Sequence, residues 1–227
     1  MLLAAYPRDT MKRALPVRLL AALGLVLLGT ACKEITTMNF REVPVTPQVR
    51  ARKQAPLPAR VGLYISDDFM NFHFEIDQKG LGGIASYLGW IDPGRPLAIA
   101  FYQGACGTFE HAYFLEAFTP GQPVADRDTQ LVIVPRIERF EFRAAHTGFS
   151  SNAVTVRLHT VVYDGGGRTL FTVDREVKRT AAMIGSMLGN GSFGDVKRIC
   201  DEASSEVLDQ TLGAIQEQRT ASAAGGS

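Results

Sequence analysis

The clearest pattern of apolar and polar positions lies in the second half of the chain, where the β-prone run 154–163 predicts a strand. The glycines of 165–167 follow directly and a second β-prone run occupies 168–178, so the three stretches together predict a β-hairpin. Residues 72–77 alternate apolar and polar with a period of two, as a strand buried on one face would. A further long strand is predicted over 131–143, where Pro135 bends it or confines it to a sheet edge.

Two other stretches place apolar residues at the spacing of a helix. One covers 96–110 and the other covers 195–219, where apolar residues recur mostly at three and four. Shorter strands are predicted at 61–65 and 72–77. This order predicts an α+β fold, in which a mostly antiparallel sheet is flanked by an early amphipathic helix and a C-terminal helix.

The first 31 residues have a different pattern, which is typical of an export signal. A basic segment that ends at Arg18 precedes an uncharged apolar run over 19–28. That run falls short of the roughly 20 apolar residues that cross a bilayer. Small residues follow it and lead to Cys32.

The small residues before Cys32 resemble the bacterial lipobox, in which the cysteine is acylated and becomes the N-terminus of the mature protein. Gly29 departs from the pattern, because lipoboxes usually carry Leu three residues before the cysteine. The resemblance implies a signal peptide at 1–31 and a lipid such as palmitate on Cys32. Met11 looks like a more conventional start than Met1, and the sequence leaves both starts open.

The resemblance also implies a location. Lys33 stands where inner-membrane lipoproteins of the enterobacterial pattern carry Asp, so the expected protein is lipid-anchored in the outer membrane and faces the periplasm. From 32 to 60 the prolines and the lack of an apolar period predict an extended, poorly ordered tether. A single α+β periplasmic domain is expected at 61–219, followed by a disordered tail at 220–227.

The charge balance excludes one class of partner. The formal net charge of +1 becomes about −2 when the four basic residues and the one acidic residue of the first 31 are removed. Nucleic-acid binding requires a clear basic excess, so no nucleic acid is expected as a partner.

Two further cysteines and one apolar segment are candidate sites. Cys106 and Cys200 can form a disulfide in an oxidising compartment, or can remain free. The uncharged segment 181–193 is a contact loop for another protein or for lipid, or it packs over the sheet edge. Its candidate contact residues are Met183, Ile184, Met187, Leu188 and Phe193.

Motifs that would indicate catalysis lack the context that they need. The glycines of 189–196 match a phosphate-loop spacing, but the elements that such a loop requires around it are not predicted, so a turn that caps the last helix is favoured. His73, Glu75 and Asp77 share one face of a predicted strand, yet they lie too far apart along it to hold one metal ion without help. We therefore expect no enzyme, no metal and no cofactor.

Two classes of function remain open. The first is a non-catalytic envelope lipoprotein that acts as a periplasmic accessory or assembly component of an export machine, through contacts with a partner protein or with copies of itself. The element order is similar to that of accessory lipoproteins of the curli-secretion and Pel-export type. The alternative is a lipid- or small-ligand-binding transporter accessory lipoprotein, with a pocket between Phe101 and Phe109 of the early helix and Phe140 and Phe142 of the sheet.

Overall fold

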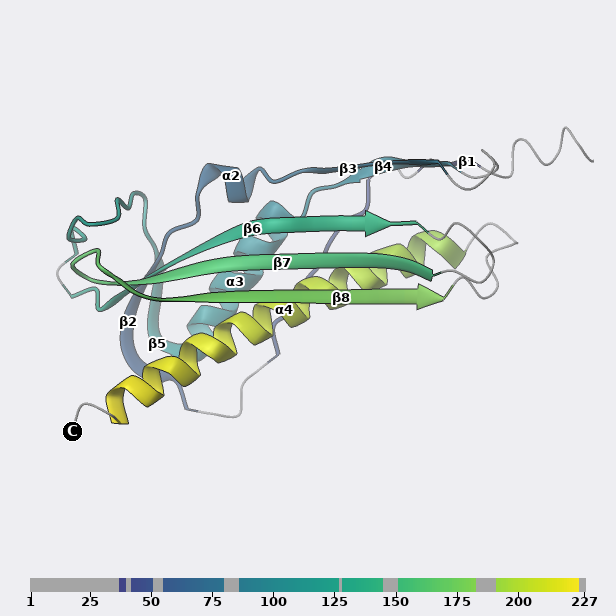
Figure 1. Cartoon of the computed structure of the whole chain (residues 1–227). Coiled ribbons are helices and arrows are strands. Elements are labelled where there is room, and N and C mark those ends of the chain that lie inside the picture. Colours follow the sequence, from purple (N-terminus) through teal and green to yellow (C-terminus); the bar gives the residue numbers. More distant parts are fainter. Residues whose placement is uncertain are drawn as a thin grey trace, which may run out of the picture.

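The computed structural model describes residues 37–39, 42–50, 55–79, 86–126, 128–144, 151–182 and 191–224. Five strands form the larger sheet, in the order β5-β2-β6-β7-β8 (Figure 1). They are β2 (Leu57–Leu63), β5 (Phe109–Phe114), β6 (Leu131–Arg143), β7 (Ser151–Asp164) and β8 (Thr169–Ala182). The smaller sheet has the order β1-β4-β3 and is formed by β1 (Thr37–Asn39), β3 (Phe74–Lys79) and β4 (Ser86–Ile91).

The larger sheet is mixed. β6, β7 and β8 are antiparallel neighbours, whereas β2 pairs in parallel with both β5 and β6. Most of the paired residues belong to the long antiparallel strands, and the predicted α+β fold with a mostly antiparallel sheet is confirmed. The parallel pair β2–β5 follows from its connection, because the chain passes through the smaller sheet and α3 (Gly94–Thr108) before it returns as β5.

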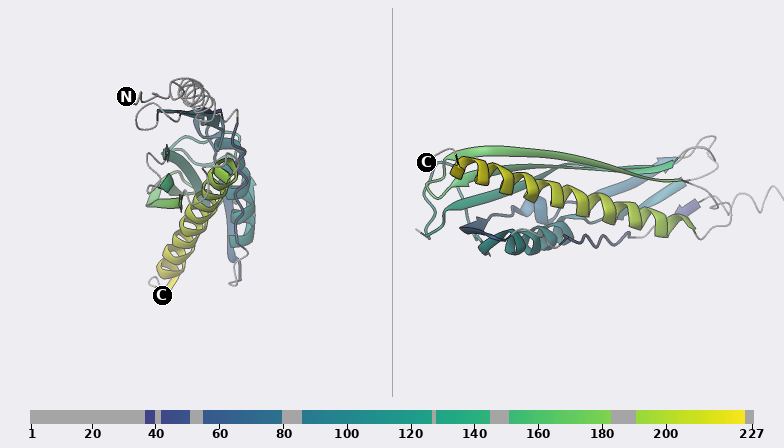
Figure 2. Two further views of the ribbon diagram at one scale, coloured as in Figure 1. Left: turned by 90° about the vertical axis from the view of Figure 1, so that its right-hand side faces the viewer. Right: turned by 90° about the horizontal axis from the view of Figure 1, so that it is seen from below.

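The helix α4 (Gly191–Ala224) covers the larger sheet. It lies alongside β8 and packs on β7, and α3 lies on the same side of the sheet (Figure 2). The apolar positions that the sequence predicts for one face of α4 are all fully buried: Val196, Ile199, Cys200, Ala203, Val207, Leu208, Leu212 and Ile215. This apolar stripe holds α4 on the sheet, because the rest of the helix is polar.

The C-terminal helix is longer than the predicted range of 195–219. It continues through residues 220–224, where the Thr220 and Ser222 hydroxyls each donate a hydrogen bond to the backbone carbonyl four residues earlier. This corrects the expectation that the tail is disordered from Thr220; the last three residues lie outside the described part of the chain. A one-turn helix, α2 (Asp67–Met70), precedes β3, and no helix in the described ranges is both long and apolar enough to cross a bilayer.

One apolar core fills the space between the larger sheet and the helices. Phe101 of α3 and Phe109 of β5 are fully buried, and Phe140 and Phe142 of β6 are at most 4% exposed. All four belong to the same cluster of buried residues, together with Leu158 of β7. Packed side chains therefore occupy the place where the alternative prediction put a ligand pocket.

Residues 42–50, which we call the strap, pass from β4, where Val43 forms a bridge with Ile91, to the polar side of α4. The backbone N–H of Thr46 donates to Asp201 Oδ1 at 2.6 Å and that of Gln48 donates to Ser205 Oγ at 2.9 Å. The backbone N–H of Arg50 donates to Asp209 Oδ1 at 3.1 Å. Alternate strap residues are thus held by side chains at every fourth position of the helix.

The strap and the helix have matching repeats. Two residues of an extended, proline-containing segment advance by about 6 Å, and four residues of an α-helix advance by the same amount. Pro44 and Pro47 favour that extended form, and Val43 and Val45 are at most 4% exposed. The expected tether is therefore extended over 42–50, but it lies on the fold and contributes to the core instead of standing away from it.

We expect Asp201→Ala to release the strap, because this carboxylate accepts from both the backbone N–H and the hydroxyl of Thr46 and also from Lys197. The free energy of unfolding should fall by about 1 kcal/mol, the typical value of a hydrogen bond. Amide hydrogen exchange at Thr46 should accelerate more than exchange in the β7–β8 hairpin. Glu202→Ala is the matched control, since Glu202 pairs with Arg198 on the helix itself. Unchanged exchange at Thr46 would contradict the role given to Asp201.

Candidate functional site

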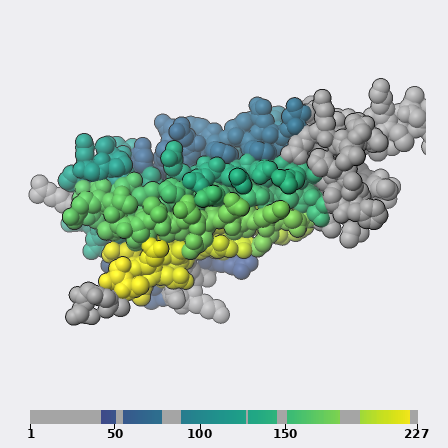
Figure 3. Space-filling model, in the orientation of Figure 1, coloured from purple at the N-terminus to yellow at the C-terminus, as the bar shows by residue number. Residues whose placement is uncertain are grey.

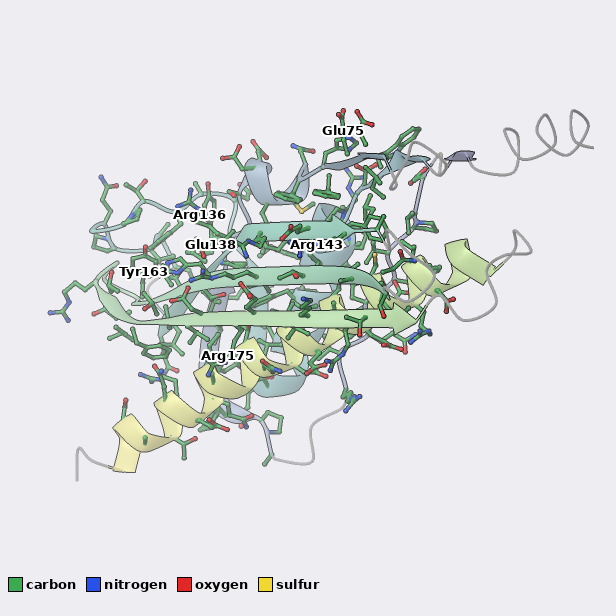
Figure 4. All side chains as sticks on the ribbon, turned by 45° about the vertical axis from the view of Figure 1, so that its right-hand side comes forward. Glu75, Arg136, Glu138, Arg143, Tyr163 and Arg175 are labelled. Carbon is green, nitrogen blue, oxygen red and sulfur yellow. The ribbon has the colours of Figure 1, made fainter. Side chains whose placement is uncertain are left out.

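The face of β6, β7 and β8 that points away from α4 is open to solvent. These strands form a broad surface toward the viewer in Figure 3, with α4 along its lower margin. Alternate residues of the strands point outward, and many are charged; Arg136, Glu138 and Arg143 of β6 are labelled in Figure 4. An antiparallel sheet with one covered and one solvated face has this alternation.

Three titratable side chains meet near the centre of the open face. Glu138, His159 and Asp174 come from three neighbouring strands, and one potential ligand atom from each lies within 4.8 Å of the other two. His159 Nδ1 lies 2.8 Å from Asp174 Oδ1 and 3.9 Å from Glu138 Oε1. We call these residues the three-strand cluster. Their side chains are between 26% and 47% exposed, so that solutes can reach them.

Backbone register places the cluster. His159 and Asp174 are directly opposite each other in the β7–β8 ladder. The β6–β7 ladder shifts register between Ile137 and Arg139. Glu138 is the extra residue of this β-bulge, with no residue of β7 directly opposite it. Glu138 and Arg139 are consequently both exposed, and β6 resumes its alternation with Phe140 in the core.

Arginines surround the cluster. Arg157 Nε lies 2.9 Å from Glu138 Oε2, and a second nitrogen of Arg157 lies 3.9 Å from Asp174 Oδ1. Arg136 is directly opposite His159 in the β6–β7 ladder. The two carboxylates of the cluster are thus balanced by nearby cations, and one oxygen of Glu138, Oε1, faces His159 instead of an arginine.

His73, which the sequence analysis considered as a metal ligand, has its neighbouring carboxylates arranged differently. His73 Nδ1 lies 2.5 Å from Asp92 Oδ1, while Nε2, on the other side of the ring, lies 3.8 Å from Glu75 Oε1. Two carboxylates on opposite sides of one imidazole cannot coordinate the same ion with it. Asp77 lies further along β3 and is exposed.

A polar groove runs along the outer side of α4. It has a volume of about 1070 Å³ and lies between the strap, α4 and the inner residues Arg175 and Arg179 of β8. Arg179 forms an ion pair with Glu206 of α4 across it, and Arg175 is labelled beside α4 in Figure 4. A second, smaller cavity of about 330 Å³ is lined by Arg60, Cys106 and the start of β5. Charged and polar groups line both the groove and the smaller cavity, so neither is suited to an apolar ligand.

Exposed apolar side chains gather where α3 meets β5. Ile99 is 51% exposed and Phe114 is 48% exposed. The ring of Tyr102 stacks on that of Phe114, with 4.5 Å between the ring centroids. We call Ile99, Tyr102 and Phe114 the β5 patch. A hydrogen bond with the neighbouring Cys106 raises the pKa of the Tyr102 hydroxyl.

The β5 patch borders a free strand edge. β5 ends the strand order of the larger sheet, and within the described residues only β2 pairs with it. An edge strand has backbone N–H and C=O groups that another strand can pair with. The exposed rings beside it add apolar area of the kind that marks protein interfaces. The sequence did not single out this surface, because neither the edge position of β5 nor the stacking of its Phe114 has a local signal.

Most of the sequence-predicted site residues fall outside the described part of the chain. This holds for Cys32 and for Met183, Ile184, Met187 and Leu188. Phe193 lies in the first turn of α4, but its side chain is outside the description. The proposed contact loop therefore stays a prediction.

The two remaining cysteines are free thiols. Cys106 is exposed on α3 and Cys200 is buried in α4. In this structure the two cysteines form no disulfide with each other. Burial raises the pKa of the Cys200 thiol to about 12, since a thiolate would lose its hydration there.

Comparison with known proteins gives similarity of fold. No family description matches the chain, and no curated protein matches it. A crystal structure of a Xanthomonas campestris protein assigned to DUF330 superposes with a TM-score of 0.52 at 13% identity, covering 80% of this chain and 99% of that one. A minor lipoprotein from Acinetobacter baumannii reaches 0.40 at 10% identity, covering 72% and 95% of the two chains. The PelC dodecamer from Paraburkholderia phytofirmans reaches 0.35 at 10% identity, covering 69% and 91%.

These similarities extend over nearly the whole length of each matched protein. At 13% identity the Xanthomonas protein shares the fold of this chain. What the chain binds has to be argued from its own surfaces.

The thiols should differ in reactivity. In a mature chain that carries Cys32→Ser, iodoacetamide at about pH 8, near the ordinary pKa of a thiol, should label Cys106 and leave Cys200 unmodified. Unfolding in urea should expose Cys200 and allow both to react, which mass spectrometry of the tryptic peptides would measure. Labelling of neither thiol before reduction would show that they are bonded, and equal labelling of both in the folded chain would contradict the burial of Cys200.

Proposed function

We propose that this chain is a non-catalytic, lipid-anchored protein of the bacterial outer membrane that faces the periplasm and serves as an accessory or assembly component of an envelope machine. It acts through protein–protein contacts. The observation that carries this proposal is the free edge of β5 with the exposed β5 patch beside it, on a domain whose interior is filled.

The filled interior supports contact over ligand storage. A site for a lipid or another apolar molecule needs an apolar cavity of at least about 300 Å³. Here the aromatic side chains of α3 and β6 pack into one core, and the two surface spaces described above are polar. The exposed apolar area is on the outside, where it is available to another protein.

The first described strand shortens the distance between the proposed anchor and the domain. β1 begins at Thr37, only five residues after Cys32, and pairs with β4. Five extended residues reach at most about 18 Å, whereas a tether ending at residue 60 would reach several times as far. A lipid on Cys32 would therefore keep the domain close to the membrane, and a partner would have to meet it there.

Lipidation is the first test. Labelled palmitate should be incorporated into the wild-type protein and should be absent from Cys32→Ala, because the acyl chain needs that sulfur and the mature N-terminus it creates. Membrane fractionation of the wild type should recover it with the outer membrane. Label that persists in Cys32→Ala would refute the anchor, and recovery with the inner membrane would refute only the location.

The contact surface is tested separately. A photo-crosslinking amino acid at Glu110, an exposed residue of β5, should give a specific adduct in intact cells. The same amino acid at Arg136, exposed on the interior strand β6, is the control and should give much less. The adduct mass distinguishes a second copy of this chain from another envelope protein.

A surface substitution sharpens this test. Phe114→Ser should reduce the Glu110 adduct severalfold, because it removes the exposed ring while the fold keeps its core. Leu170→Ser is the matched control, since Leu170 is 43% exposed at the start of β8. Equal adduct yields from Glu110 and Arg136, or no effect of Phe114→Ser, would count against the β5 edge as the interface.

A further inference from the structure

We propose that the three-strand cluster of Glu138, His159 and Asp174 is a binding site for a divalent transition-metal ion, with Zn²⁺ as the best match to its donors. This site is independent of the lipid anchor and of the β5 edge. It lies on the open face of the sheet, where the sequence predicted no metal.

The donor atoms converge on one point. Around a tetrahedral Zn²⁺ with bonds of about 2.1 Å, neighbouring ligand atoms are about 3.4 Å apart. In the cluster, His159 Nδ1 lies 2.8 Å from Asp174 Oδ1 and 3.9 Å from Glu138 Oε1. The three ligand atoms all lie within 4.8 Å of one another, so side-chain movements on the order of 1 Å bring all three donors into the coordination shell.

Both carboxylates approach the same nitrogen of the imidazole, and this distinguishes the cluster from the arrangement at His73. There the carboxylates of Asp92 and Glu75 lie against different ring nitrogens, Nδ1 and Nε2. An ion bound to one side of the His73 ring can have only one of them as a further ligand. The chain thus contains a converging and a diverging His–carboxylate set, and the second serves as an internal control for the first.

The backbone under the cluster is held by regular ladders. β7 and β8 are paired along nearly their whole lengths, with His159 opposite Asp174. Glu138 projects from the β-bulge of β6, a device that redirects side chains at sites. Ligands on paired strands keep their positions better than ligands on loops, which lowers the cost of ordering them around an ion.

Arg157 limits the affinity. Its guanidinium holds Glu138 Oε2 at 2.9 Å and leaves Oε1 directed at His159. A hydrogen-bonded second oxygen is the usual state of a metal-ligating carboxylate, and it orients the ligand. The same cation repels a divalent ion, and Arg136 opposite His159 adds to this repulsion. The site is consequently one that exchanges its ion, with water in the fourth position on the solvent side.

The chemistry of the donors selects the metal. Imidazole nitrogen with two carboxylate oxygens suits Zn²⁺ and its neighbours in the transition series, whereas Mg²⁺ and Ca²⁺ prefer oxygen ligands alone. Coordination through Nδ1 of His159 requires that this nitrogen present its lone pair to the ion instead of a proton.

The test uses the mature chain with Cys32→Ser and Cys106→Ser, so that no exposed thiol competes for zinc. Titration calorimetry with Zn²⁺ alone should give one ion per chain, and Mg²⁺ at the same concentration should give no heat. His159→Ala and Asp174→Asn should each weaken Zn²⁺ binding at least tenfold, while His73→Ala should leave it unchanged. The urea unfolding curve of each variant checks that it is folded; Asp174→Asn keeps the shape of the side chain.

Arg157→Gln distinguishes a metal site from a simple network of ion pairs. Removal of the competing cation should tighten Zn²⁺ binding about fivefold or more, given the strength of a unit charge at about 4 Å. If the cluster serves only as an ion-pair network, this variant will not gain affinity. No Zn²⁺ binding by the parent chain, or equal binding after His159→Ala, would overturn the proposal.

Discussion

Eight apolar side chains of α4 leave water when the helix lies on the sheet, and the other features of the fold depend on that contact. Burial of a Val, Leu or Ile side chain contributes about 1.5–3 kcal/mol relative to its exposed state. The stripe fixes which side of the helix faces β7 and β8, and therefore which side is left for the strap. It also decides which face of the sheet is covered, and the opposite face stays open for charged groups.

The strap depends on this orientation and reinforces it. Asp201, Ser205 and Asp209 form a row on α4 because the apolar stripe occupies the adjacent positions, and the row matches the repeat of an extended chain. Gly104 of α3 completes the arrangement, since a side chain there would collide with Leu212 of α4 and Val49 of the strap. The absence of a side chain at Gly104 thus allows α3, α4 and the strap to approach closely.

The order of apolar and polar residues predicted those strands and helices whose formation depends on residues close together in the sequence. The range 131–143 was predicted as a strand and is β6, and the hairpin of β7 and β8 follows its alternation and turn. The parallel pairing of β2 and the docking of the strap depend on contacts between distant residues, so no local pattern indicates them. The three-strand cluster was missed for the same reason, because strand register brings its members together, whereas the more visible His73, Glu75 and Asp77 share a strand face without converging.

The surfaces that stay exposed after the helices have packed on the sheet determine where the chain can bind. Within the described residues the core is filled, and the β5 patch at one end of the strand order is an exposed apolar surface that a partner can meet. The three-strand cluster spans the strands at the other end, and its ion pairs keep that face hydrated in the absence of an ion. The proposed contact surface and the proposed ion site thus lie on different strands of one sheet, so each can be changed without replacing a residue of the other.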